Sequence, residues 1–308
     1  LGPTWVWPDY QPVAAEWLVR LGLETLPQFD EGDAVIDDGP ELPATRQMIP
    51  GQQGIRKIAD GAAAIIERLV SRLPADMIVT NSPVTQITNR DDSIEISVSG
   101  PAGETSIRSR FAVIATPLRV AATSIAWSPE QDRSFIRAMI DTPTWMAVHA
   151  KAIALYDQPF WRQQGLSGRI ASRAGPLVEA HDHSGENGSP AAIFGFVGWP
   201  PDIREDLGDK PAGEITAQLA RCLGPQAGRP IAVHIEDWAL NDHICTPLDA
   251  RGPMNHPEIA PDIIRQPHLG RRVVFAAAET SVRSPGLIEG AFAAGMSAAG
   301  MILKIRAD

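Results

Sequence analysis

The segment that most constrains the fold lies near the end of the sequence, where a strand-like run leads through a short loop into a helix. Residues 272–278 form an apolar run, and residues 286–304 place Gly, Ala and Met at helical intervals. A buried strand that delivers the chain to a helix start exposes unpaired backbone N–H groups and the positive dipole end, which favour an anionic or electron-rich ligand edge. A closely packed helix without a ligand has the same spacing, so the pattern alone leaves both interpretations open.

Apolar periodicity elsewhere predicts a mixed α/β (α+β) fold. Helical spacing followed by Gly or Pro predicts three further helices, at residues 13–23, 61–72 and 213–223. Alternating or continuous apolar runs predict strands at residues 77–80, 84–88, 93–99, 106–109, 111–116, 146–156 and 191–198. The run at 111–116 is apolar throughout and ends at Pro117, which is typical of a strand buried on both faces. The acidic, turn-rich stretch 26–50 reads as a loop with at most one short strand.

Composition excludes several partner classes. The net charge is −10, and the longest basic run is the pair Arg271-Arg272, so the chain lacks the positive footprint that nucleic-acid binding requires. The longest uninterrupted apolar stretches are strand-length, far below the roughly 20 residues of a membrane span. We therefore expect neither a nucleic-acid partner nor a membrane.

Cysteine and histidine usage bounds the compartment and the metal chemistry. Cys222 and Cys245 form no paired motif, which argues against a disulfide framework or a cysteine-based zinc site and fits a reducing cytoplasm. No signal peptide is visible. The triplet His181-Asp182-His183 lacks a third ligand and precedes a Gly/Ser/Asn-rich stretch, so we expect a solvated loop and no metal.

Two blocks resemble signatures of flavin-dependent amine oxidases of the monoamine oxidase type. Residues 277–280 (Ala-Ala-Glu-Thr) and 286–291 (Gly-Leu-Ile-Glu-Gly-Ala) are similar to the strand exit and helix start beneath the flavin ring in that family. Residues 151–162 are similar to the family strand that carries a buried lysine into a Pro-Phe-Trp-Arg corner. Burying Lys151 in an apolar strand is costly unless it is hydrated or paired, which makes it a functional candidate on physical grounds too. An exposed lysine with a buried stem is the alternative.

The resemblance implies a role for each matched residue. Lys151, the candidate catalytic residue, is expected to hold a water molecule against flavin N5. Further blocks at 1–8, 58–61, 81–87 and 113–117 follow the family in order. The implied cofactor-binding residues are Thr4, Trp5, Val84, Pro117, Trp238, Glu279, Thr280, Leu287 and Ile288.

The sequence also departs from the family. No Gly-x-Gly-x-x-Gly occurs, so the element that brings the pyrophosphate of a dinucleotide to a helix N-terminus is missing. Leu287 stands where many family members place one of two aromatic rings beside the substrate. Cys245 lies a few positions early for covalent flavin attachment. The resemblance implies noncovalent FAD, provided that the missing N-terminal segment is supplied.

These observations combine into one expected organisation. Residues 1–12, 58–138 and 241–308 are expected to form a discontinuous, incomplete Rossmann-like FAD-binding domain. Residues 13–57 and 139–240 are expected to form a substrate domain built on an antiparallel sheet with helices. The implied activity is FAD-dependent oxidation of a small-molecule amine to an imine with O₂ as acceptor. Assembly into a homodimer is an open alternative to a monomer. The alternatives are an N-terminally truncated, inactive relative that does not hold FAD, one subunit of a split flavoprotein, and a noncatalytic binding module.

Overall fold

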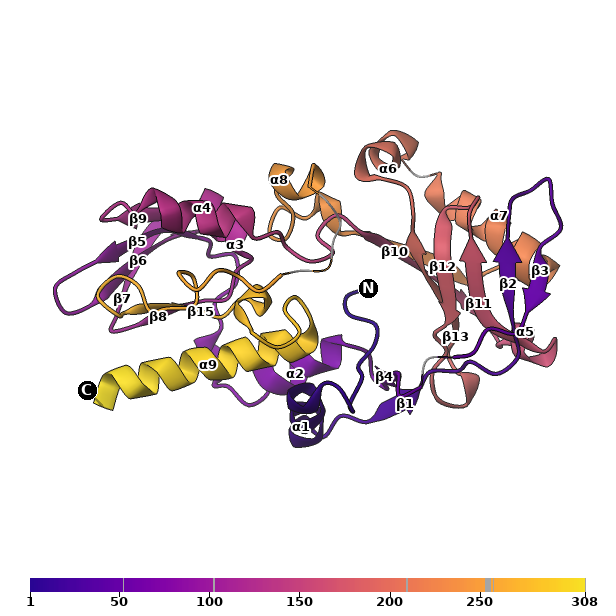
Figure 1. The fold of residues 1–308 in the computed structure, drawn as a ribbon, viewed down its shortest axis with the longest axis horizontal. Coiled ribbons are helices and arrows are strands. Elements are labelled where there is room, and N and C mark those ends of the chain that lie inside the picture. Colours follow the sequence, from indigo (N-terminus) through magenta and orange to yellow (C-terminus); the bar gives the residue numbers. More distant parts are fainter. Residues whose placement is uncertain (52, 102, 209, 253–255, 257, 308) are drawn as a thin grey trace. The chain divides into compact units, whose positions relative to one another are not determined.

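A computed structural model describes residues 1–308 except 52, 102, 209, 253–255, 257 and 308 (Figure 1). The chain forms two compact units, each assembled from several segments. Unit 1 contains residues 1–10, 18–65 and 148–240, and unit 2 contains 11–17, 66–147 and 241–308. The predicted mixed α/β fold is confirmed, because both units combine strands and helices.

Unit 1 is built on a seven-stranded sheet of order β14-β10-β13-β12-β11-β2-β3. The sheet is antiparallel except for β11 and β2, which pair in parallel. Its strands are β2 (Asp33–Asp37), β3 (Thr45–Gln47), β10 (Ala150–Tyr156), β11 (Leu166–Ser172), β12 (Leu177–Asp182), β13 (Ala191–Val197) and β14 (Ala232–Asp237). The antiparallel sheet expected for the substrate domain is therefore present.

Helix α7 (Pro211–Leu223) packs on one face of this sheet. Pro211 occupies its first turn, where a missing N–H costs nothing, and Gly224 ends it at a φ of 97°. Its buried residues, including Ile215 and Leu219, share one core with alternate residues of β10, such as Ala152. Because side chains alternate along a strand, the residues between them, including Lys151, face the opposite side of the sheet.

Two predictions for unit 1 need correction or adjustment. The stretch 26–50 is mainly loop, as predicted, but it holds more than one short strand, because β2 and β3 lie within it and β2 pairs with β11. The acidic residues of β2 made this strand look like an exposed loop in the sequence. In the structure Asp37 is fully buried and paired with Arg221. The strand expected from residue 146 begins only at Ala150, because residues 145–148 form turns.

The remaining elements of unit 1 are short. They are β1 (Thr25–Pro27), β4 (Arg56–Ile58), α5 (Phe160–Gln163), α6 (Pro201–Leu207) and the 3₁₀ turns η2 (Glu186–Gly188), η3 (Pro225–Gly228) and η4 (Trp238–Leu240). Helices α1 (Pro12–Leu21) and α2 (Ala63–Val70) contribute residues to both units. Both were predicted from their spacing and are confirmed.

Unit 2 contains a four-stranded sheet of order β7-β6-β5-β9 and a parallel pair, β15 and β8. Its elements are η1 (Ala75–Met77), β5 (Val84–Asn89), β6 (Ile94–Gly100), β7 (Gly103–Ser109), β8 (Ala112–Ile114), α3 (Leu118–Ser124), β9 (Ala126–Ser128), α4 (Arg133–Asp141), α8 (Pro247–Ala250), β15 (Val273–Phe275), η5 (Ala278–Thr280) and α9 (Ile288–Ala307). The strand expected at 77–80 is wrong, because Met77 closes a 3₁₀ turn and the next strand starts at Val84.

The closing strand, loop and helix of unit 2 are confirmed. β15 is buried throughout and contacts α9. β8 differs from the prediction of burial on both faces, because Val113 is 50% exposed while Ala112 and Ile114 are buried. A continuous apolar run is compatible with burial on both faces of a strand. It does not establish that other elements cover both faces.

Helix α9 is long and apolar enough, by length and composition, to cross a membrane. It has 20 residues, and 22% of its most apolar window is buried. The sequence has no uninterrupted apolar stretch of this length, because Gly and Ser residues interrupt the apolar residues of α9. The expectation based on uninterrupted stretches therefore did not single out this helix.

Candidate functional site

Lys151 lies in the middle of β10 and is 4% exposed. Its Nζ donates a hydrogen bond to the Gly2 carbonyl oxygen at 2.7 Å, and it lies 5.5 Å from the Phe196 ring centre and 5.9 Å from that of Phe194. Burial lowers the pKa of Lys151 to about 8. The alternative of an exposed lysine is wrong, and this ammonium, though still mostly protonated at neutral pH, loses its proton more readily than an ordinary lysine.

The N-terminal segment brings two predicted tryptophans to the same part of unit 1 as Lys151. The Trp5 indole packs against His181, Phe194 and Phe196, and its Nε1 donates to Gln28 Oε1 at 2.9 Å. Trp238 Nε1 donates to the Leu1 carbonyl oxygen at 3.2 Å.

Since Lys151 and Trp238 both donate to carbonyls of residues 1–2, the chain start ties these two predicted residues together. Thr4 is half-buried beside Trp5.

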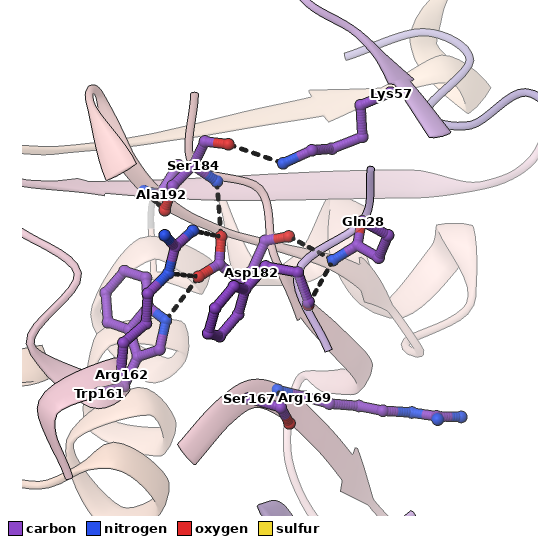
Figure 2. Close-up of polar contacts among 10 residues, drawn as sticks. Gln28, Lys57, Trp161, Arg162, Ser167, Arg169, Asp182, Ser184 and Ala192 are labelled. Atoms are coloured by element: carbon purple, nitrogen blue, oxygen red, sulfur yellow. Dashed lines mark hydrogen bonds and ion pairs between the residues drawn. The ribbon is translucent and has the colours of Figure 1, made fainter. Parts of the chain in front are cut away.

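Asp182 organises the polar network of this region, as Figure 2 shows. It is fully buried and accepts hydrogen bonds from Arg162 Nε and Nη2 at 2.7 and 2.9 Å, from Trp161 Nε1 at 2.8 Å and from the Ser184 N–H at 2.8 Å. Burial alone would raise the pKa of Asp182, but these donors outweigh it and the pKa is lowered. A bidentate guanidinium with additional donors is the arrangement that makes a buried carboxylate tolerable.

The expectation of a solvated loop at residues 181–183 is therefore wrong. His181 and Asp182 end strand β12 and are buried, because the Trp161-Arg162 corner supplies the partners of the carboxylate. A Cβ at Gly168, which has a φ of 76°, would lie 2.9 Å from both Asp182 Cβ and Trp161 Nε1. Only glycine permits this close approach without displacement. Among the described residues, no three His, Cys, Asp or Glu side chains are arranged to hold a metal.

Two titratable groups lie beside this network: Lys57, which sequence reasoning missed, and His183, which it considered only as a metal ligand. Lys57 Nζ donates to the Ser184 carbonyl oxygen at 2.7 Å, and burial lowers its pKa to about 8. Burial and nearby Lys57 lower the pKa of His183 to about 4, so its imidazole is neutral at pH 7. His183 Nδ1 is buried without a hydrogen-bond partner in the described part of the chain. Lys57 directly precedes the apolar Ile58 in β4, and this neighbour is the only local sign in the sequence that Lys57 is buried.

The other predicted residues lie in unit 2. Glu279 and Thr280 form η5 and are buried, and burial raises the pKa of Glu279. The predicted Leu287 and Ile288 lead directly into α9. Val84 opens β5, and Pro117 precedes α3. Whether Lys151 and Ile288 converge on one cavity stays a prediction.

Glu289, quoted in the sequence only as part of a motif, has a structural role. It is 1% exposed, and its carboxylate accepts the Ala14 N–H at 2.6 Å and the Val13 N–H at 3.3 Å. It therefore satisfies the unpaired N–H groups at the start of α1 and complements the positive end of that helix.

Comparisons with known proteins agree on one family. The model of the family described as flavin containing amine oxidoreductase matches residues 38–303. A probable flavin-containing monoamine oxidase A of Dictyostelium discoideum is 27% identical over 61% of this chain and 40% of its own length. The flavin-containing amine oxidase A of Equus caballus is 26% identical over 80% of this chain and 46% of its own. The chain thus spans about half the length of the curated relatives that it matches.

A solved structure supports the fold. A putrescine oxidase variant from a study of cofactor-binding redesign superposes with a TM-score of 0.80 over 98% of this chain and 88% of its own. At 17% sequence identity, that likeness shows the fold alone.

Proposed function

Because the chain belongs to the flavin containing amine oxidoreductase family, we propose that it serves the oxidation of a small amine to an imine, with noncovalent FAD as cofactor and O₂ as acceptor. The observation that supports this best is Lys151, a buried lysine with a pKa near 8, held by a backbone carbonyl beside a wall of aromatic rings. Bound flavin would supply the two-electron chemistry that converts the amine to an imine and oxygen to hydrogen peroxide.

The residues around Lys151 fit the isoalloxazine ring of FAD better than its nucleotide half. Trp5 and Phe196 offer flat apolar surfaces, and Lys151 offers a donor whose proton is weakly held. Trp5 and Trp238 would wall the ring, and Lys151 would hold a water molecule at its edge. The family resemblance assigns Thr4, Val84, Pro117, Glu279, Thr280, Leu287 and Ile288 to further cofactor contacts.

One sequence observation favours a second candidate. No Gly-x-Gly-x-x-Gly occurs in the 308 residues, so these residues do not themselves supply the usual backbone cradle for the pyrophosphate. The second candidate is thus a relative that does not retain FAD by itself, either inactive or one part of a split flavoprotein. Cytoplasmic localisation, a homodimer and the exclusion of nucleic acid and membrane partners stay predictions.

Reconstitution separates the two candidates. The purified chain is titrated with FAD while the flavin absorbance and fluorescence are followed, and hydrogen peroxide is then measured with a panel of primary amines. A saturable spectral change and amine-dependent peroxide support the oxidase. Unbound flavin at all concentrations, with no peroxide, supports the second candidate.

Lys151→Met tests the lysine in the reconstituted protein. Loss of the ammonium should slow flavin reoxidation by O₂ at least tenfold while the cofactor stays bound, since a positioned proton-transfer group contributes roughly 10²–10⁴-fold in rate. The exposed Lys210→Met in the same unit is the matched control and should leave reoxidation unchanged. Unchanged oxygen kinetics in Lys151→Met would remove this lysine from the mechanism.

A further inference from the structure

The seven-stranded sheet of unit 1 has two edges, and one of them is protected against further pairing. At the edge formed by β3 (Figure 1), the strand has only three residues, carries Arg46 and lies between Pro43 and Pro50. Short length, a basic side chain and nearby prolines are common means by which proteins keep an edge strand from pairing with another chain. The opposite edge, formed by β14, lacks all three features.

β14 is a regular strand with an open side. It pairs along its whole length with β10 without a register shift, and it contains no Pro, Lys or Arg. Arg204 neutralises the charge of Asp237 at its end. The middle of the strand is exposed, and the apolar side chain of Ile235 there is 37% exposed. A regular, exposed edge of this kind is a template for pairing with a further strand.

The free backbone groups of β14 follow from its hydrogen bonds to β10. The Trp238 N–H donates to the His149 carbonyl oxygen, in the same register that pairs the two strands. In an antiparallel pair, successive residues point their N–H and C=O groups alternately toward the partner strand and away from it. The even-numbered residues of β14 therefore bond to β10, and the backbone groups of the odd-numbered ones point to the free edge: Val233, Ile235 and Asp237.

A second copy of β14 fits this edge in an antiparallel, two-fold arrangement centred on Ile235. Ile235 then lies opposite its own copy, and the outward backbone groups of Val233 meet those of Asp237 in the other chain. On the other face of the sheet His234 lies opposite Glu236, and symmetry repeats this contact. Neither side chain has a hydrogen-bond or ion-pair partner in the described part of the chain, so each is available to the other.

Charge selects this register among its neighbours. A centre at Glu236 would place two carboxylates directly opposite one another, and like charges in that position are destabilising. A centre at His234 would place two imidazoles opposite one another and leave Glu236 without a partner. The centre at Ile235 instead pairs each imidazole with a carboxylate and places two apolar side chains at the two-fold axis.

We propose that β14 is the interface of a homodimer, in which two seven-stranded sheets join edge to edge into one continuous sheet. This inference does not depend on flavin binding. Glu236 pairs with Lys151 across the sheet, so the interface lies one strand away from the candidate catalytic lysine. With strands about 4.8 Å apart, the backbone of His234 of the partner subunit lies about 10 Å from that of Lys151. The dimer therefore adds a second imidazole to the surroundings of this lysine.

Sedimentation velocity over a concentration series tests the interface. We expect the purified chain to form a species of twice its mass of 33.1 kDa. Ile235→Lys places like charges at the two-fold axis and should weaken association at least tenfold. Ile235→Pro removes an N–H that points away from β10, so it should block pairing while the bonds to β10 remain. Ile203→Lys on α6 changes a similarly exposed isoleucine and should leave the dimer intact.

A charge exchange tests the register, with far-ultraviolet circular dichroism to check that each variant is folded. His234→Glu alone and Glu236→His alone each place like groups opposite one another, so each should weaken association. The double variant restores both pairs and should restore the dimer. A chain that is monomeric at all concentrations, a dimer that survives Ile235→Lys and Ile235→Pro, or a double variant that does not recover association would overturn the proposal.

Discussion

The two compact units stabilise their functional segments by different means. In unit 1, side-chain ion pairs support the sheet that carries Lys151, and three of them are largely buried: Asp37 with Arg221, Asp182 with Arg162, and Asp237 with Arg204. Unit 2 also has a buried ion pair, Arg119 with Asp249, but its β15, η5 and α9 segment is held by contacts to backbone groups. Gly290 lies against the carbonyls of Ser284 and Ala278, and the Glu289 carboxylate caps backbone N–H groups of α1.

This difference predicts where each unit is sensitive to mutation. A buried ion pair fixes geometry strongly, but removing one partner leaves an uncompensated charge. A close backbone contact carries no charge, but it restricts the position to glycine. The face that carries Lys151 should therefore respond most to changes of charge, and Gly290 at the start of α9 should respond to changes of volume.

The largest effect is expected from Asp182→Ala. Arg162 and the Trp161 Nε1 would lose their buried partner, so the free energy of unfolding should fall by roughly 3–5 kcal/mol. Urea denaturation measures this change, and hydrogen exchange should show the loss of protection in β11, β12 and β13.

The control for this variant is Asp262→Ala, whose side chain is 80% exposed in its pair with Arg265. That change should stay within about 0.5 kcal/mol. Comparable losses in the two variants would remove the distinction drawn for unit 1.

A smaller effect is expected from Gly290→Ala in α9. The added Cβ would overlap the Ser284 carbonyl oxygen and press on that of Ala278, so unfolding should become easier by roughly 1–3 kcal/mol. Gly295→Ala is the matched change in the same helix, with no atom within 4 Å of its Cβ, and should stabilise the helix by roughly 0.5–1 kcal/mol. Thermal denaturation measures both changes. Opposite signs would support the role of volume at Gly290, and equal signs would contradict it.

The smallest effect is expected from Lys151→Met at neutral pH, and it should be stabilising. Burial holds the pKa of Lys151 near 8, below its ordinary value of 10.5, so the unfolded chain binds more protons between these pH values. Stability of the wild type should therefore rise with pH from 8 to about 10. Met should add about 1–2 kcal/mol at pH 7 and almost nothing near pH 10.

Denaturation of both proteins across this pH range measures the gap. A gap that is constant with pH would mean that the buried charge of Lys151 is not the source of the difference.

The sequence predicted the elements whose pattern is local. The helices at 213–223 and 286–304 and the strand at 191–198 are confirmed, because periodicity and a terminal Gly or Pro are properties of a few adjacent residues. Lys151 was also found from one strand, since an isolated lysine among apolar residues is unusual wherever the strand packs.

The features that the sequence did not predict depend on residues far apart in the chain. The burial of Asp182 depends on Arg162, twenty residues earlier, and that of Asp37 in β2 depends on Arg221 of helix α7. A short acidic strand has no local signal that distinguishes it from a loop. Lys151, Phe196 and Glu179 are neighbours across the sheet only through the register of three strands, which the sequence does not specify by itself.

The carboxylate of Glu289 has a consequence for the order of biosynthesis. Val13 and Ala14 are translated some 275 residues before their acceptor. At roughly 5–20 residues per second, the first helix waits from about fifteen seconds to a minute for this partner. During that interval the nascent chain exposes an incompletely docked amphipathic segment, and synthesis of α9 supplies the carboxylate that completes its docking.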